Sequence, residues 1–283
     1  MTRLDPKTLD VVRLALAEDV GAGDVTTDAT VPPDQVSRAT IVAKAEGVVS
    51  GTAVVEAVFR ELDADARVTA LVPEGGRVQP GTPVALVEAH TRAVLTGERT
   101  ALNFLQRLSG IATATARYAS ELEGTGVRLL DTRKTAPGLR ALEKQAVAAG
   151  GGRNHRMGLW DMALVKDNHI AAVGGITAAV DRVRRRAPSV AVEVEVTTLE
   201  GLREAVAAGV ERIMLDNMPP DAMREAIREA RAASPAPEIE ISGGVSLENV
   251  RTLAALRPDF ISVGAITHSA PALDMSLELE EER

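Results

Sequence analysis

The C-terminal half of the chain repeats one pattern, which constrains the fold more than any other feature of the sequence. Six short apolar segments each run into a cluster of polar residues or glycines, and helical patterns rich in alanine, arginine and glutamate separate them. The ends of the six segments are marked by Asp131, Lys166, Glu195, Asp216, Ser242 and Gly264. Their spacing of 21 to 35 residues is typical of βα units around a parallel sheet and predicts a complete or slightly short α/β barrel. A doubly wound sheet is the alternative, but no G-x-G-x-x-G motif follows a first strand.

The sequence before this repeat has a different character. Asp5 and Pro6 are typical of a helix start, and Gly21 is typical of a helix end. Over residues 39–88, short runs of β-branched residues alternate with glycine and proline, and one helix is expected at Thr52–Arg60. These residues predict a separate α+β unit.

Two further segments are expected to link this unit with the repeat. A long helix is predicted at about Leu95–Leu122, and helices of that length usually bridge domains or pack along an interface. The tail Leu273–Leu279 is predicted to return to the first unit as a strand.

The composition argues against several classes of function. The 283 residues include 32 Lys and Arg against 40 Asp and Glu, and the formal net charge of −8 argues against a general binder of nucleic-acid phosphates. Three Phe, one Tyr and one Trp argue against recognition of nucleic acid by stacking. The lack of cysteine excludes disulfides and thiolate chemistry. Because no apolar run is long enough for a membrane span or a signal segment, we expect a cytoplasmic protein that does not bind membranes.

The polar residues after the predicted strands are candidates for an active site, because the C-terminal strand ends of a barrel form one rim. Charged members of this set are Arg133, Lys134, Lys166, Asp167, His169, Glu195 and Asp216. A single charge at a strand end is usually solvated or salt-bridged, but the repetition over successive strands favours a convergent site. Residues 131–169 contain seven bases and four acids, a balance of +3 that indicates an anionic ligand.

Glycine-rich clusters follow the last two predicted strands, at Ser242–Gly244 and Val263–Ala265. Loops at these places in barrels commonly bind phosphate through backbone N–H groups. Glu195 and Asp216 would repel a polyanion unless they hold Mg²⁺ or sugar hydroxyls. The pattern therefore predicts a phosphorylated sugar, a divalent cation and a second ligand with carboxylates.

The segment Gly150–Arg156 is predicted to be a flexible loop that delivers His155 and Arg156 to an anion. No zinc site is predicted, because His155 and His169 are too far apart for a helical histidine pair and cysteine is absent. The sequence also lacks the G-x-S-x-G motif of serine hydrolases and the acidic loops that bind calcium.

Six motifs spread over nearly the whole chain resemble the quinolinate phosphoribosyltransferase family. They lie at Glu18–Thr27, Glu98–Asn103, Asp131–Arg140, Gly151–Arg156, Leu164–His169 and Glu193–Val196. The Asp-Thr-Arg-Lys-Thr and Asn-His-Arg motifs together are highly specific. The resemblance implies an enzyme of de novo NAD synthesis that uses Mg²⁺. Such an enzyme converts quinolinate and phosphoribosyl pyrophosphate to nicotinate mononucleotide, CO₂ and pyrophosphate.

The resemblance also implies an architecture and an assembly. It implies an N-terminal α/β sandwich domain at residues 1–108, completed by residues 270–283, and an open, incomplete α/β barrel at residues 109–269. Similar enzymes form homodimers or higher homo-oligomers with active sites shared between subunits. The sequence leaves the choice between dimer and hexamer open.

Roles for single residues follow from the same resemblance. Lys134, Lys166, Glu195 and Asp216 are implied as catalytic residues, and the two acids also as direct or indirect ligands of Mg²⁺. Arg99 would reach into the neighbouring subunit's site. The implied substrate-binding residues are Arg99, Thr132, Arg133, Lys134, Thr135, His155, Arg156, Lys166, Glu195, Asp216, Ser242, Gly243, Gly244, Val263, Gly264 and Ala265. Those expected to hold the two carboxylates of quinolinate are Arg133, Lys134, His155 and Arg156.

Two alternatives remain open. A paralogue of the same fold could use another acceptor, such as nicotinate, and would then need to grip only one carboxylate. A non-catalytic binding or carrier protein would bind phosphoribosyl pyrophosphate without turnover, although the retained Lys134, Lys166, Glu195 and Asp216 argue against it.

Overall fold

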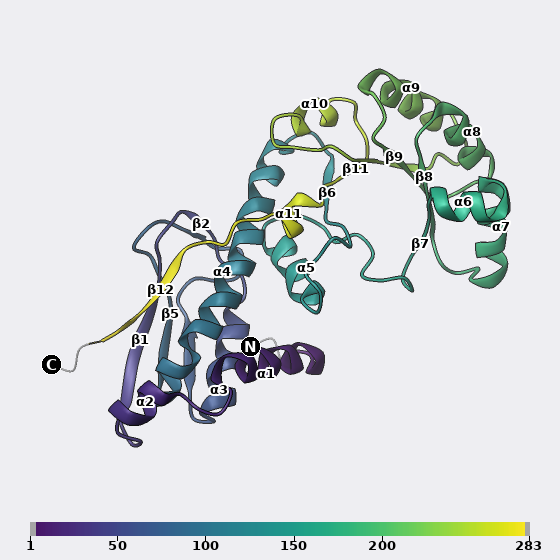
Figure 1. The fold of residues 1–283 in the computed structure, drawn as a ribbon. Coiled ribbons are helices and arrows are strands. Elements are labelled where there is room, and N and C mark those ends of the chain that lie inside the picture. Colours follow the sequence, from purple (N-terminus) through teal and green to yellow (C-terminus); the bar gives the residue numbers. More distant parts are fainter. Residues whose placement is uncertain (1–3, 281–283) are drawn as a thin grey trace. The chain divides into compact units, whose positions relative to one another are not determined.

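The structure, a computed structural model, describes residues 4–280, which divide into two units (Figure 1). Unit 1 comprises the residues up to Ala116, Thr135–Gly151 and the residues from Ala265 on. Unit 2 comprises Arg117–Lys134 and Gly152–Gly264. Residues 1–3 and 281–283 of the predicted N-terminal domain lie outside the described part of the chain.

Unit 1 contains an antiparallel sheet in the strand order β12-β1-β5-β3. These strands are β1 (Val36–Ala43), β3 (Arg67–Ala70), β5 (Pro83–His90) and β12 (Met275–Leu279). In β1 the alternate residues Ala39, Ile41 and Ala43 are fully buried, as a sheet with one face on the core requires. Strand β12 pairs with β1, so the predicted return of the tail as a strand is confirmed (Figure 1).

The other elements of unit 1 are six helices and a small two-stranded sheet within the described residues. The helices are α1 (Pro6–Val20), α2 (Val25–Thr30), α3 (Thr52–Leu62), α4 (Thr91–Glu121, of which the part up to Ala116 belongs here), α5 (Arg140–Ala149) and α11 (Ala265–His268). The small sheet pairs β2 (Gly47–Val48) with β4 (Arg77–Val78). The predicted start of α1 is confirmed, because the Asp5 carboxylate accepts the N–H groups of Lys7 and Thr8. Its predicted end at Gly21 is confirmed as well. Within residues 4–280, no helix has both the length and the apolar character needed to cross a membrane.

Unit 2 contains a parallel sheet in the strand order β6-β11-β10-β9-β8-β7. Its strands are β6 (Arg128–Leu130), β7 (Ala163–Val165), β8 (Val192–Val196), β9 (Arg212–Asp216), β10 (Glu238–Ser242) and β11 (Phe260–Ser262). They correspond to the six apolar segments predicted from the sequence. Figure 1 shows the six strands along a curve. In the described residues β6 and β7, at the two ends of the strand order, do not pair, so the barrel is open, as expected.

The helices of unit 2 follow the strands and cover the outside of the curved sheet. They are α6 (Asp167–Val173), α7 (Ile176–Arg186), α8 (Leu199–Ala207), α9 (Pro220–Arg231) and α10 (Val250–Ala254). Figure 1 shows α7, α8 and α9 on the outer side of the strands. The buried residues of α9 are Met223, Ala226, Ile227 and Ala230, a helical spacing that places one apolar stripe against the sheet.

A buried ion pair joins three segments of unit 1. The Glu143 side chain on α5 is fully buried, and its Oε1 accepts a hydrogen bond of 2.8 Å from Arg107 Nη2 on α4. The same guanidinium donates to the carbonyl oxygen of Thr267 at 2.7 Å. Glu143 Oε2 accepts the N–H of Ala136 at 3.2 Å. One carboxylate therefore holds α4, α5 and the 136 loop together.

We expect Arg107→Leu to lower the free energy of unfolding by about 3–5 kcal/mol, because it leaves the Glu143 carboxylate buried without its cation. Chemical denaturation followed by circular dichroism measures the change. Arg13→Leu is the matched control, since Arg13 pairs with Glu61 at the surface and its loss should cost less than about 1 kcal/mol. Equal losses in the two variants would contradict the importance of the buried pair.

Candidate active site

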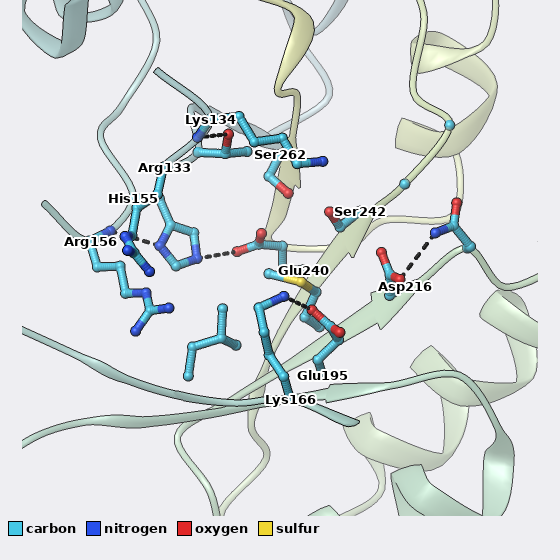
Figure 2. A pocket seen from close by; sticks show the side chains of 16 residues that line it. Arg133, Lys134, His155, Arg156, Lys166, Glu195, Asp216, Glu240, Ser242 and Ser262 are labelled. Atoms are coloured by element: carbon cyan, nitrogen blue, oxygen red, sulfur yellow. Dashed lines mark hydrogen bonds and ion pairs between the residues drawn. The ribbon is translucent and has the colours of Figure 1, made fainter. Parts of the chain in front are cut away.

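A cavity of about 570 Å³ lies at the C-terminal ends of the unit 2 strands (Figure 2). The residues that line it all belong to unit 2, and most end or directly follow a strand. The parallel register explains their convergence, because it pairs Glu195 with Met214 and Asp216 with Ser242. The lining residues are Thr132, Arg133, Lys134, His155, Arg156, Leu164, Lys166, Glu195, Met214, Asp216, Asn217, Glu240, Ser242, Gly243, Gly244 and Ser262.

Most residues of the predicted site line this cavity. They are Thr132, Arg133, Lys134, His155, Arg156, Lys166, Glu195, Asp216, Ser242, Gly243 and Gly244. Val263 and Gly264 are not among the lining residues, and the Val263 N–H donates to the carbonyl oxygen of Leu130 at 3.0 Å. Arg99, Thr135 and Ala265 belong to unit 1. The roles assigned to all these residues stay predictions.

Other lining residues were not found by sequence reasoning. They are Leu164, Met214, Asn217, Glu240 and Ser262. A signal for Glu240 was present, because an acid between Ile239 and Ile241 faces the opposite side of its strand from those apolar neighbours. The same alternation places Glu193 on the same side of β8 as Glu195.

Lys166 and Glu195 form an ion pair at the cavity wall (Figure 2). The Glu195 side chain is only 13% exposed, so the pair is partly screened from water. The backbone N–H of Lys166 donates to His169 Nδ1 at 3.0 Å. The His169 side chain therefore caps the first turn of α6. His169 and Asp167, both expected at the rim, are not among the lining residues.

A tight turn after β9 brings Asp216 next to the glycines after β10. Asn217 has a positive φ of 51°, and its side-chain amide donates to Asp216 Oδ2 at 3.0 Å. Gly243 also has a positive φ, of 86°, and a Cβ atom there would lie 2.2 Å from Asn217 Oδ1. Only glycine fits at this position, for conformational and steric reasons.

The expectation of a flexible loop before Arg156 is wrong for residues 153–156, because their backbone is bonded to the end of β6. The Arg153 N–H donates to the carbonyl oxygen of Leu129 at 2.8 Å, and Asp131 N–H donates to that of Arg153 at 3.1 Å. The buried Asp131 carboxylate then accepts the N–H of His155 at 2.8 Å. The glycines before Arg153 therefore lead into a segment whose backbone is held in place.

His155 is buried between two glutamates from different strands. Its Nε2 lies 3.0 Å from Glu193 Oε2 on β8 and 3.5 Å from Glu240 Oε2 on β10. Its Nδ1 accepts a hydrogen bond of 2.7 Å from the N–H of Arg156. Figure 2 shows the ring between the Arg156 backbone and Glu240. Both glutamate side chains are fully buried.

The glutamates and the imidazole shift each other's proton affinity. Burial alone lowers the pKa of His155, but the hydrogen bonds and charges of Glu193 and Glu240 outweigh it and raise the pKa to about 9. Burial and then the charge of Glu240 raise the pKa of Glu193 to about 7. The trio therefore binds a proton more tightly than isolated groups would. The Arg156 N–H disfavours this proton on Nδ1, so the trio holds it between Nε2 and the two carboxylates.

Two sets of side chains could hold a cation. Glu195 and Asp216 line the cavity and offer the oxygen ligands that Mg²⁺ prefers. The ligand atoms of His155, Glu193 and Glu240 lie within 4.8 Å of one another and form a second set beneath it.

Comparisons with known proteins identify the family. The model described as quinolinate phosphoribosyl transferase, C-terminal domain, matches residues 111–278, and the corresponding N-terminal domain model matches residues 24–109. The chain belongs to the quinolinate phosphoribosyltransferase family. The resemblance seen in the sequence motifs is thereby confirmed.

Individual members of the quinolinate phosphoribosyltransferase family are similar over almost their whole length. The nicotinate-nucleotide pyrophosphorylase (carboxylating) of Mycobacterium leprae is 45% identical, over 95% of this chain and 96% of that protein. The chloroplastic enzyme of that name from Arabidopsis thaliana is 43% identical, over 96% and 82%. The nicotinate-nucleotide pyrophosphorylase structure from Francisella tularensis gives a TM-score of 0.91 at 36% identity and covers 98% of each chain. The predicted fold class is therefore confirmed.

In this family member we expect Gly243→Ala to weaken the binding of phosphoribosyl pyrophosphate at least about fivefold, since a clash of this kind costs about 1–3 kcal/mol. Isothermal titration calorimetry measures the affinity. Gly81→Ala is the matched control, because Gly81 has the same φ of 86° but nothing within 4 Å of the added Cβ. Unchanged affinity in Gly243→Ala would remove this turn from the phosphate site.

Proposed function

We propose that this chain transfers the phosphoribosyl group of phosphoribosyl pyrophosphate to the ring nitrogen of quinolinate. Decarboxylation then gives nicotinate mononucleotide, CO₂ and pyrophosphate for NAD biosynthesis. The supporting observation is the convergence of four cationic side chains in one cavity with two carboxylates at its strand ends, while a third, that of Glu240, pairs with His155. The six are Arg133, Lys134, Arg156, Lys166, Glu195 and Asp216. A cytoplasmic location stays a prediction of the sequence.

The basic wall of the cavity suits a dianion. Burial and then the charge of Arg133 lower the pKa of Arg156, as expected for two guanidinium groups that line one cavity. A ligand with two carboxylates relieves the repulsion between these cations and accepts paired N–H donors from each arginine. Leu164 and Met214 line the same cavity and offer apolar contact to a pyridine ring. A nearly aromatic-free site therefore binds a ring mainly through its carboxylates.

The opposite wall suits the phosphorylated sugar. Ser242, Gly243 and Gly244 line the cavity, and backbone N–H groups of such glycine turns bind phosphate oxygens. Lys134 and Lys166 add positive charge. Glu195 and Asp216 fit a site for Mg²⁺, because both are carboxylates on one cavity wall. When bound, the cation would neutralise charge on the departing pyrophosphate. Lys166 would hold Glu195 in place until substrate enters.

The proposed reaction needs positioning more than proton transfer. The ring nitrogen bonds to C1 of the ribose while the bond from C1 to the pyrophosphate oxygen breaks. Glu195 or Asp216 stabilises the positive charge that develops on the sugar. Lys134 and Lys166 stabilise the negative charge that develops on the departing pyrophosphate. The resulting pyridinium nitrogen accepts the electron pair of the bond to the adjacent carboxylate, and CO₂ leaves. The ring carbon then takes a proton from solvent, so no protein base is required before CO₂ departs.

We expect the purified protein to form nicotinate mononucleotide and an equal amount of CO₂ from quinolinate, phosphoribosyl pyrophosphate and Mg²⁺. Chromatography and captured ¹⁴CO₂ measure the two products, and chelation of Mg²⁺ should stop both. Nicotinate in place of quinolinate should react far more slowly, since nicotinate has one carboxylate and makes only one of the two carboxylate contacts of quinolinate. Equal use of nicotinate would indicate the paralogue, and binding of phosphoribosyl pyrophosphate without turnover would indicate a binding protein.

We also propose a homodimer, or a higher assembly built from it, in which Arg99 completes the neighbouring subunit's site. The side chain of Arg99 on α4 is exposed and thus accessible to a second subunit. Arg99→Ala and Lys166→Ala should each be inactive alone, and a heterodimer of the two should regain activity because one of its sites is intact. Differential tags and native mass spectrometry verify the heterodimer. Lack of recovery in a verified heterodimer would contradict shared sites.

A further inference from the structure

Glu193 and Glu240 have no part in the reaction as proposed, yet with His155 they form a buried trio next to the cations of the cavity. His155 and Glu240 both line the cavity, whereas Glu193 lies behind them. The four carboxylate oxygens of the two glutamates and His155 Nε2 are buried, and among the described residues they meet only in ion-pair contacts, without hydrogen-bond geometry. Within residues 4–280 their polar contacts are the ion-pair contacts to His155 and one of 3.7 Å from Arg212 to Glu240. Such groups cost folding free energy and call for a reason.

The hydrogen bonds of His155 show which ring nitrogen holds the proton. Nδ1 accepts the N–H of Arg156 at 2.7 Å, so Nδ1 has no proton. The ring proton is therefore on Nε2, which faces Glu193 at 3.0 Å and Glu240 at 3.5 Å. The two glutamates thus select one tautomer and one orientation of the ring.

The same tautomer argues against a metal ion at this trio, although its ligand atoms are close enough for one. A histidine that binds a metal through Nε2 donates its Nδ1–H to a partner. Here Nδ1 is an acceptor, and Nε2 is occupied by its proton.

The orientation of His155 fixes Arg156. The imidazole binds the Arg156 backbone N–H, and the buried Asp131 carboxylate binds the N–H of His155 at 2.8 Å. At its other end, the Arg156 guanidinium donates to the carbonyl oxygen of Met162 at 3.2 Å and lines the cavity. A turn of the imidazole would free the Arg156 backbone and so displace its guanidinium.

We propose that Glu193 and Glu240 are positioning residues for quinolinate binding, which hold His155 as the Nε2–H tautomer and through it direct Arg156 at the substrate carboxylates. This inference rests on the proposed function. It differs from a general stabilising role, because it concerns the quinolinate side of the cavity alone. The phosphate side, at Ser242–Gly244, has no contact with the trio's acceptor atoms among the described hydrogen bonds.

The first test compares two changes at Glu193. Glu193→Leu removes the acceptor, and we expect the KM for quinolinate to rise about tenfold while the KM for phosphoribosyl pyrophosphate stays within about twofold. Glu193→Gln keeps an acceptor oxygen and should restore most of the quinolinate affinity. Glu225→Leu is the control, since Glu225 is half-exposed on the outer helix α9, pairs with Arg228 and should change neither KM. An unchanged quinolinate KM in Glu193→Leu, or equal increases in both KM values, would overturn the proposal.

The second test reads the ring directly and needs no substrate. The chain contains 4 histidines, so ¹⁵N-histidine NMR of the wild type, with His155→Gln for assignment, resolves the ring nitrogens of His155. We expect a protonated Nε2 and an unprotonated Nδ1, unaltered by one equivalent of Zn²⁺. A protonated Nδ1, or displacement of these resonances by Zn²⁺, would overturn the inference even if Glu193→Leu fails to fold. Failure of the wild type to use quinolinate would instead overturn the proposed function, and this measurement would still decide the ring geometry.

Discussion

The parallel register of the unit 2 strands is the constraint on which the site depends. In a strand, every second side chain faces the same side, and adjacent parallel strands keep those side chains level. Glu193 thus pairs with Arg212, Glu195 with Met214, and Asp216 with Ser242. The open barrel in this way stacks polar layers toward its C-terminal edge. A shift of one residue in any strand would turn its polar side chains out of the interior.

Electrostatic balance within the barrel is as important as its positive rim. The sequence count of +3 over residues 131–169 indicates an anion site, but Glu193 and Glu240 lie outside that stretch and bring negative charge beneath it. Arg212 offsets part of this charge, and its guanidinium also lies 4.0 Å from the centre of the Phe260 ring. Cations at the rim are therefore placed above acids rather than above an apolar core. This layering keeps the empty site from excessive repulsion.

Much of the fold and of the candidate site could be predicted from sequence, because the signals were local. Asp5 as a helix cap, the strand-then-cluster repeat, and the tail as β12 each depend on a few consecutive residues. The contacts of His155 could not be predicted, because Glu193 and Glu240 are distant in sequence and only the strand order brings them together. The backbone near Arg153 is likewise held by a bridge to Leu130, which the glycines at 150–152 do not predict. Pairings between strands, rather than the strands themselves, were beyond the sequence.

The pairing of β12 with β1 determines when the sheet of unit 1 can be completed during synthesis. A ribosome completes every residue of unit 2, which ends at Gly264, before it adds Met275–Leu279. Until then β1 has an uncovered edge, with unpaired backbone groups open to other chains. The sheet of unit 1, although most of its strands are synthesised first, is therefore completed only after unit 2, and the nascent chain depends on Met275–Leu279 to cover an edge prone to aggregation.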